Sequence, residues 1–362
     1  MRALIDAHQL GRSQTGNETW ARNILAGLTS TGSDELHVAV TEAGRPDLAG
    51  RIPADRTHVV AGRSARRLAV DLPRVLRSVR PQSLLVQYTL PPMSRVPGVV
   101  VVHDLSFERP EARDWIPRPS LLRYRASIRA SAVRARRVVV PSQFTKDDVI
   151  QRYGVHEDRV MVAGNALDSA LEVALRSTPR STRGDQLVVL AVGTVLPRKN
   201  LEVLACAVDT LRDEGLPVVL RLVGPLSGAG CQALGRMSDR LGAALEVTGV
   251  VDTAGLAAAY RCADVLAFPS LFEGFGIPLV EAMAAGTPVV SSDSSCLPEI
   301  GGDAVLYAAP HRPDAWVDAL RLVLTDQATA ARLAAAGTAR SVEYDWGRSA
   351  ETVRRALAEA AG

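Results

Sequence analysis

The chain has 362 residues, of which 47% are hydrophobic and 22% are charged. This length exceeds the usual size of one domain, so we expect two domains of roughly 150 to 200 residues each. The formal net charge of +3 is too small to indicate a nucleic-acid partner, and we expect none.

No apolar run of about 18 residues, the length that would suggest a membrane span, occurs in the chain. The opening stretch "MRALIDAHQL" reaches an acid at Asp6, which is unlike the apolar core of a signal peptide. We therefore expect a cytoplasmic protein.

The basic residues are almost all arginine, because lysine occurs only at Lys146 and Lys199 among 42 basic residues. We attribute this bias to the coding background, which weakens arginine clusters as functional signals and strengthens the two lysines. The arginine-rich stretch 118–137 is either a solvated helix face or a basic helix in weak contact with an anionic membrane. We favour the solvated face.

Short apolar runs alternate with helical patterns along the whole chain. Continuous runs of this kind, separated by helices, predict parallel sheets covered on both faces. In the first half the runs lie at 3–7, 36–40, 84–87, 98–103, 137–142 and 159–164. In the second half they lie at 187–193, 218–224, 245–250, 264–270 and 287–292.

This pattern predicts an α/β protein with two doubly wound, Rossmann-like domains that face each other across a cleft. We place the N-terminal domain at 1–172 and a Ser-, Thr-, Pro- and Arg-rich linker at 173–186. A C-terminal domain follows at 187–344, and 345–362 is predicted to form a helix that packs back on the N-terminal domain.

Ligands of open parallel sheets bind beyond the carboxyl ends of the strands, so polar residues at those points are candidates for function. His103 and Asp104 end the run 98–103. We expect His103 to contact substrate and Asp104 to turn the chain by accepting backbone NH groups. Gly16 precedes a helix expected near Glu18, where a phosphate-binding and a purely structural role are equally compatible with a lone glycine.

In the second half, Arg198 and Lys199 follow a strand that is predicted to end at Gly193, just before a helix that begins near Asn200. Cations in such a loop suit a leaving diphosphate, whose negative charge grows as its bond to carbon breaks. A surface turn is the alternative, and the scarcity of lysine favours function.

The stretch "EGFGIPLVE" begins after a strand over 264–268. Gly274 and Gly276 bracket Phe275 in a turn, and a helix is predicted over 278–285 because Pro278 suits its first position and Gly286 its end. The free NH groups and positive dipole end of this helix form an anion site for a phosphate or diphosphate.

Two glutamates, Glu273 and Glu281, frame this turn. A carboxylate beside a phosphate is unfavourable unless it serves another partner, and the hydroxyl groups of a sugar or ribose are the obvious candidates. In the alternative interpretation, Glu273 is a loop acid and Glu281 a solvated helix residue.

Several motifs are absent from the sequence. It contains no DxD triplet, so we expect no metal site, and it has no GxGxxG after the first strand, no GxxxxGK[ST] and no GxSxG. These absences argue against a dehydrogenase, a P-loop NTPase and a nucleophile-elbow hydrolase.

Taken together, these residues resemble the retaining glycosyltransferase family 4, which has the two-domain GT-B architecture. The resemblance rests on "EGFGIPLVE" followed by "AMAAGTPVVSSDSSCLPEIGGDA", and it extends over nearly the whole chain. Further matching segments are "VVHDLSFERPE", "PSQFTKDDVIQRYGV", "VGTVLPRKNL" and "YDWGRSAETV".

The resemblance implies a role for each candidate residue. Glu281 would hold the ribose hydroxyls of the nucleotide and Glu273 a hydroxyl of the donor sugar, while Lys199, helped by Arg198, would neutralise the diphosphate. His103 would lie near the transferred sugar. The remaining implied donor contacts are the backbone of Gly274, Phe275, Gly276 and Ile277 and, beside the nucleobase, the turn at Gly249 and Val250.

This chain departs from the family pattern in two loops. Family members often carry an arginine after the glycine of the phosphate loop, where this chain has Thr194, so Arg198 is expected to supply that charge. The N-terminal loop often has two close glycines, whereas Asn17 follows Gly16 here, which weakens the expected contact of Gly16.

The sequence thus predicts a metal-independent, retaining hexosyltransferase that needs no cofactor and uses a nucleotide-diphosphate sugar, with GDP-mannose as a first guess. The acceptor is a glycan, a lipid-linked molecule or a small molecule. A phosphorylase or epimerase of the same architecture is an alternative, as is a catalytically idle sugar-nucleotide-binding protein.

Overall fold

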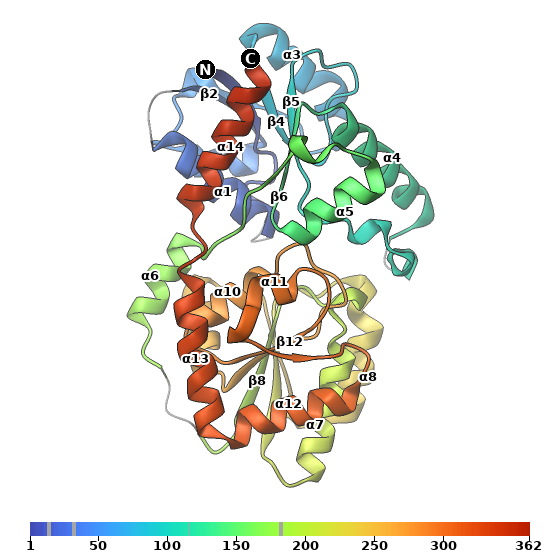
Figure 1. Cartoon of the computed structure of the whole chain (residues 1–362), viewed down its shortest axis with the longest axis vertical. Helices are drawn as coiled ribbons and strands as arrows, with labels where there is room; N and C mark the ends of the chain where they lie inside the picture. The colour runs from blue at the N-terminus through green and yellow to red at the C-terminus, as the bar shows by residue number, and fades with distance from the viewer. Residues whose placement is uncertain (13–15, 31–33, 115, 181–183) are drawn as a thin grey trace. The chain divides into compact units, whose positions relative to one another are not determined.

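The protein is described from a computed structural model, which places residues 1–12, 16–30, 34–114, 116–180 and 184–362. The chain forms two compact units (Figure 1). Unit 1 contains residues 1–109, 118–165 and 345–362, and unit 2 contains residues 110–117 and 166–344.

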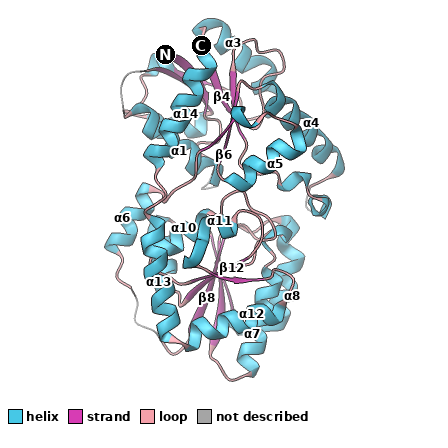
Figure 2. Ribbon diagram, in the orientation of Figure 1, coloured by secondary structure: helices cyan, strands magenta, loops and turns pink. Residues whose placement is uncertain are grey.

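Unit 1 is built on a seven-stranded sheet in which every strand is parallel to its neighbours (Figure 2). Its order is β3 (Thr57–Val59), β2 (Glu35–Val40), β1 (Arg2–Asp6), β4 (Ser83–Gln87), β5 (Gly98–Val101), β6 (Arg137–Val140) and β7 (Val160–Val162). The strand order reverses between β1 and β4, which makes the carboxyl ends of these strands the topological switch point.

The helices of unit 1 cover this sheet. Helix α14 (Trp346–Ala361) lies beside α1 (Gly16–Thr29), and both contribute to one apolar core with the strands (Figure 1). Helices α3 (Leu72–Val79), α4 (Arg118–Arg134) and α5 (Gln143–Tyr153) contact β2, β5 and β6, respectively. The short α2 (Ser64–Arg66) continues into a π-helical turn, η3 (Arg67–Asp71).

Unit 2 repeats this scheme with six parallel strands. Their order is β10 (Leu245–Gly249), β9 (Val218–Val223), β8 (Leu187–Val192), β11 (Val265–Phe268), β12 (Val289–Ser292) and β13 (Leu306–Ala308). The switch point lies between β8 and β11, both central and buried on both faces, which explains why they read as continuous apolar runs.

Eight helices are described in unit 2. They are α6 (Ser169–Ser177), α7 (Leu201–Asp213), α8 (Cys231–Leu241), α9 (Thr253–Cys262), α10 (Ile277–Ala284), α11 (Leu297–Gly301), α12 (Pro313–Thr325) and α13 (Gln327–Ser341). Helices α7, α8 and α12 share a core with β8, β9 and β11, whereas α9 and α10 also contact β8 and β11.

Short 3-10 turns join these elements in the described parts of the chain. They are η1 (Glu42–Leu48), η2 (Ala54–Arg56), η4 (Ser106–Glu108), η5 (Pro110–Asp114), η6 (Glu157–Arg159), η7 (Pro197–Lys199), η8 (Gly228–Gly230), η9 (Gly242–Ala244) and η10 (Gly302–Ala304). No helix among the described residues is long and apolar enough to cross a bilayer.

The two parallel sheets confirm the predicted α/β class with two doubly wound units. The division between them differs from the predicted boundary at residue 172 and the predicted linker at 173–186, because unit 2 already begins at Ala166. The Asp168 side chain caps α6 by accepting from Ala170 N at 2.9 Å, so the predicted linker begins inside a helix. The segment 345–362, which forms α14, belongs to unit 1.

Candidate functional site

The switch point of unit 2 brings two loops together, one after β8 and one after β11. Asn200, at the end of the first loop, has a left-handed backbone with φ 53°. Its Nδ2 donates to the carbonyl of Pro269 at 3.3 Å and to that of Pro310 at 2.7 Å. The backbone of Leu271 donates in turn to the Arg198 carbonyl at 2.8 Å. The loops that carry the predicted cations and acids are therefore bonded to each other.

Glu273 pairs with both predicted cations across this junction. Its Oε1 lies 2.6 Å from Lys199 Nζ and 2.9 Å from Arg198 Nη1, and the three side chains are at most 19% exposed. Burial alone would raise the pKa of Glu273, but the charges of Arg198 and Lys199 and the hydrogen bond from Lys199 hold this pKa at about 2. Glu273 is therefore ionised at neutral pH.

Lys199 also packs against an aromatic ring. Its ammonium group lies 4.7 Å from the centroid of Phe268, the last residue of β11, in the range of a cation–π contact. Gly193 follows β8 with φ 135°, and a Cβ built on it would lie 3.6 Å from Lys199 Nζ. The ammonium is thus held between the ends of the two central strands.

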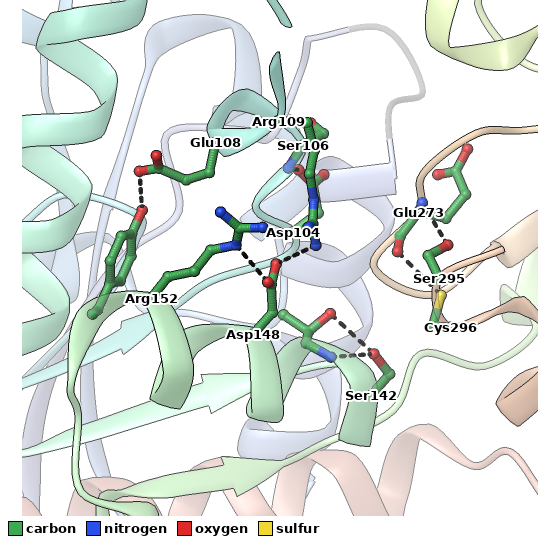
Figure 3. Close-up of polar contacts among 12 residues, drawn as sticks. Asp104, Ser106, Glu108, Arg109, Ser142, Asp148, Arg152, Glu273, Ser295 and Cys296 are labelled. Carbon is green, nitrogen blue, oxygen red and sulfur yellow. Dashed lines mark hydrogen bonds and ion pairs between the residues drawn. The ribbon is translucent and has the colours of Figure 1, made fainter. Parts of the chain in front are cut away.

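The backbone of Glu273 is fixed by the segment before α11. Its amide donates to Ser295 Oγ at 3.0 Å, and its carbonyl accepts from Cys296 Sγ at 3.3 Å (Figure 3). Ser295 itself has a left-handed backbone with φ 54°, which is uncommon for a residue other than glycine. These bonds set the direction in which the Glu273 side chain leaves the loop.

Helix α10 begins directly after this turn. Gly276 forms its N-cap with φ 91°, and a Cβ at this position would lie 2.8 Å from Leu297 Cδ2. Only glycine satisfies both the conformation and the close approach. Gly276 and Pro278 start the helix as the sequence predicts, and Phe275 is 4% exposed, with its ring packed edge-on against Tyr344.

Glu281 lies in α10 in a very different environment from Glu273. It is 9% exposed, so it is not a solvated helix residue, and its Oε2 accepts from the Tyr260 hydroxyl at 2.6 Å. Burial raises its pKa to about 7, and the charge of Asp168 adds to this increase, whereas the Tyr260 hydrogen bond opposes it. Tyr260 is fully buried in α9.

The turn after β10 holds the remaining predicted residues of unit 2. Gly249 ends β10 with φ 75°, and its carbonyl accepts from Gly224 N at 2.8 Å. Val250 follows with a side chain that is 61% exposed. Both residues thus lie at the carboxyl edge of the sheet, as the other predicted donor contacts do.

In unit 1, His103 lies just beyond β5 and is 8% exposed. Its Nε2 lies 2.8 Å from Gln87 Oε1, and its ring packs edge-on against Trp20 and Tyr88. Burial lowers the pKa of His103 to about 4, although Asp104 acts in the opposite direction. His103 is therefore neutral at pH 7, and a neutral ring donates to Gln87 from Nε2.

The segment that follows His103 is anchored at two points. Asp104 Oδ1 accepts from Ser106 N at 2.8 Å, which is the turn-forming bond expected for this residue. Farther along, Asp148 of α5 accepts from Arg109 at 2.9 Å and from Arg152 at 2.6 Å (Figure 3). Gly16 is the first residue of α1, whereas residues 14 and 15 of the predicted loop lie outside the described residues.

Sequence reasoning missed a buried ionic cluster at the carboxyl end of β1. Asp6 is 2% exposed and lies 3.1 Å from His8 Nδ1 and 3.3 Å from Arg67 Nε. Arg67 is 3% exposed in the π-helical turn, and its Nη1 has no hydrogen-bond partner among the residues that the structure describes. Asp6 is the last residue of β1 and His8 follows this strand, so the rule that singled out His103 would also have found them.

Tyr260 and Ser295 were missed for another reason, because their roles depend on contacts between distant segments that no local pattern shows. Within the described ranges, no group of three or more His, Cys, Asp and Glu side chains could hold a metal ion.

Comparison with known proteins gives matches over both units. Residues 15–171 match the model of "Glycosyltransferase Family 4", and residues 177–340 match that of "Glycosyl transferases group 1". An Anabaena protein, HepE, solved with UDP-glucose, has the same fold, with a TM-score of 0.74, 18% identity and 99% of each chain covered. The fold and these models define a GT-B glycosyltransferase.

Two curated relatives show the family to which the chain belongs. The D-inositol 3-phosphate glycosyltransferase of Corynebacterium glutamicum is 30% identical over 73% of this chain and 67% of its own length. The O-antigen chain mannosyltransferase B of Escherichia coli is 29% identical over 69% of this chain and 67% of its own length. Two D-inositol 3-phosphate glycosyltransferases, of Rhodococcus opacus and Rhodococcus erythropolis, are matched over 51% and 50% of their own length. The chain belongs to glycosyltransferase family 4.

Because the two glutamates lie in opposite environments, replacing each of them by glutamine should change the free energy of unfolding in opposite directions. The pKa of Glu273 is depressed from 4.5 to about 2, so its ionised form contributes stability that is present above pH 4.5 and lost as the pH falls toward 2. The pKa of Glu281 is raised from 4.5 to about 7, so its ionisation costs stability as the pH rises from 4.5 to 7.

We therefore expect Glu273→Gln to lower the free energy of unfolding by about 3 kcal/mol at pH 8 and at pH 5, because it leaves two cations without their carboxylate. Glu281→Gln should raise it by about 2 to 3 kcal/mol at pH 8 and by much less at pH 5. Urea unfolding of the ligand-free variants measures both. A change of the same sign for the two variants at pH 8 would contradict the assigned environments.

Proposed function

We propose that this glycosyltransferase moves a hexosyl group from a nucleotide-diphosphate sugar to an acceptor hydroxyl, with retention of anomeric configuration and without a metal ion. The observation that carries the proposal is the meeting of Lys199, Arg198 and Glu273 at the switch point of unit 2, beside the turn into α10. This arrangement supplies cations and a sugar-binding acid within one site.

The charges in this site fit a diphosphate. Two cations face one carboxylate there, so the pair with Glu273 leaves a net positive charge for an anion. The backbone NH groups at the start of α10 add the positive end of a helix dipole. In this proposal Glu273 accepts from a hydroxyl of the donor sugar, and its pairing with Lys199 links sugar recognition to the leaving group.

Glu281 is proposed to bind the ribose. The Tyr260 hydroxyl bonds Oε2 at 2.6 Å and fixes the carboxylate, which leaves Oε1 to accept from ribose hydroxyls. Retention is proposed to follow from attack of the acceptor on the face that the diphosphate leaves. The acceptor oxygen forms the new bond to the anomeric carbon, and its proton passes to the departing phosphate oxygen.

Mannose is the first sugar to test, supported by the likeness to a mannosyltransferase, and glucose is the second, supported by the likeness to a protein solved with UDP-glucose. The acceptor is proposed to be a glycan, a lipid-linked molecule or a small molecule. Part of its contact is proposed to come from the carboxyl edge of the unit 1 sheet, where His103 and Gly16 lie.

The direct test is sugar transfer or donor hydrolysis with GDP-mannose and a panel of UDP-, dTDP- and ADP-sugars, each with and without EDTA. Turnover should persist in EDTA, because Lys199, Arg198 and the start of α10 take the place of a metal. Product analysis by NMR should show the donor's anomeric configuration. Turnover that is abolished by EDTA and restored by magnesium or manganese would refute the charge scheme, and binding without turnover of any donor would indicate an idle binding protein.

Removal of each glutamate should separate nucleotide from sugar recognition. Glu281→Ala should weaken binding of the free nucleoside diphosphate by about 10- to 150-fold, because a hydrogen bond to a charged group is lost. Glu273→Ala should not weaken it, because this variant releases Lys199 and Arg198 from their carboxylate, but turnover should fall. Isothermal titration calorimetry on folded variants checks both. Equal weakening in the two variants would mean that the roles are misassigned.

Lys199→Ala should lower turnover about 10²- to 10³-fold at saturating donor, since a fixed ammonium stabilises the leaving diphosphate more in the transition state than in the ground state. Lys199→Arg should restore turnover only in part, because a planar guanidinium cannot occupy the same position against Phe268 and Glu273. Lys146→Arg, on α5 of unit 1, is the control and should be silent. Near-full turnover of Lys199→Ala would show that this loop is only a surface turn.

A further inference from the structure

Unit 1 has a cavity at the edge of its sheet where the strands begin. This edge lies opposite to the carboxyl edge of the same sheet, where His103 lies. The cavity has a volume of about 790 Å³ and surrounds the points where β5 and β6 begin and where η6 leads into β7. Five arginines contribute to its lining: Arg95, Arg134, Arg136, Arg137 and Arg159. We refer to this cavity as the arginine groove.

The positive charge of the groove is largely uncompensated. The described lining has one carboxylate, Asp158, which lies 3.3 Å from His156 and is itself 79% exposed. Glu359 pairs with Arg137 at 2.6 Å from outside the lining. Among the described residues, Arg95, Arg134 and Arg136 have no ion-pair partner, and all three are exposed.

The fold gathers these arginines through local structure. Arg134 ends α4, and two residues later Arg136 leads into Arg137, the first residue of β6. Arg159 closes the C-terminus of α4 by donating to the carbonyls of Val133, at 2.8 Å, and Ala135. Arg159 is thus mainly structural. Arg134 Nη2 donates to the Ser94 carbonyl at 3.5 Å, which joins the end of α4 to the loop that carries Arg95.

Guanidinium groups that outnumber the carboxylates around one hollow repel one another, and a bound anion with several acceptor oxygens relieves this repulsion. Arginine suits this task because its planar donor groups match phosphate geometry. The arginine-rich composition explains single arginines on the surface, but it does not explain why five line one hollow. We propose that the arginine groove binds phosphate groups.

Phosphate groups can come from a soluble phosphate ester or from the headgroups of an anionic membrane. Two exposed apolar side chains belong to the lining segments: Val133, which is 46% exposed, is part of the lining, and Met93, which is 93% exposed, directly precedes Ser94 of the lining in the chain. Both fit the acyl boundary beneath lipid headgroups. The experiment therefore has one arm for each source.

The test variant is Arg95→Gln/Arg134→Gln/Arg136→Gln. The matched control, Arg51→Gln/Arg63→Gln/Arg74→Gln, removes the same charge from exposed arginines elsewhere on unit 1. Calorimetry with inorganic pyrophosphate probes the soluble source. Flotation with vesicles of phosphatidylglycerol mixed with phosphatidylcholine, compared with phosphatidylcholine alone, probes the membrane source.

If the groove binds membrane headgroups, the groove variant should bind anionic vesicles about 100-fold more weakly than wild type. If it binds a soluble phosphate ester, the groove variant should bind pyrophosphate about tenfold more weakly. In both cases the control variant should bind nearly as wild type does. Wild type, groove variant and control variant share the same donor site, so any pyrophosphate bound there contributes equally to the three titrations. Equal binding by groove and control variants in both arms, or no binding of either probe by wild type, overturns the proposal. The readout needs no transfer activity, so it is independent of the proposed function.

Discussion

The contact on which the candidate site depends is the pairing of Glu273 with Lys199 and Arg198 at 2.6 and 2.9 Å. Each partner comes from a loop that follows one of the two central strands of unit 2, so this ion cluster joins the loops at the switch point. Because the side chains are largely buried, breaking the pair would leave charge without solvent. The cluster therefore holds both loops in place before any ligand binds.

Glu281 shows the opposite arrangement only eight positions farther along the chain. It is buried with a tyrosine hydroxyl and near another acid, Asp168, so its pKa of about 7 is far above that of Glu273. A buried acid without a cation reduces stability, and such residues are typical of binding and catalytic sites. The two glutamates thus differ in surroundings as well as in position. For this reason the same replacement by glutamine should have different effects on stability at the two positions.

Much of the fold could be predicted because central parallel strands are buried on both faces and read as apolar runs. The edge strands β3 and β13 could not be, since each has only three residues, of which at least two are not buried. The domain boundary was misplaced because loop-like composition near 176–186 outweighed the helix signal of Asp168 followed by Leu171 and Leu175. Glu273, Lys199 and Arg198 were identified from their place after strands, but their mutual pairing and the bond from Tyr260 depend on tertiary contacts.

The structure explains why Lys199 is a lysine in a chain whose basic residues are almost all arginine. In a chain that uses arginine at nearly every basic position, Lys199 stands between the Phe268 ring, Glu273 and the close backbone of Gly193. A compact ammonium can meet a ring face and a carboxylate at short range, whereas a planar guanidinium needs room for its fork. Arg198 lies where that fork fits, because its Nη1 donates to Glu273 at 2.9 Å and to the Phe272 carbonyl at 3.0 Å. The two neighbouring cations are therefore not interchangeable, and local geometry accounts for the choice of residue at each position.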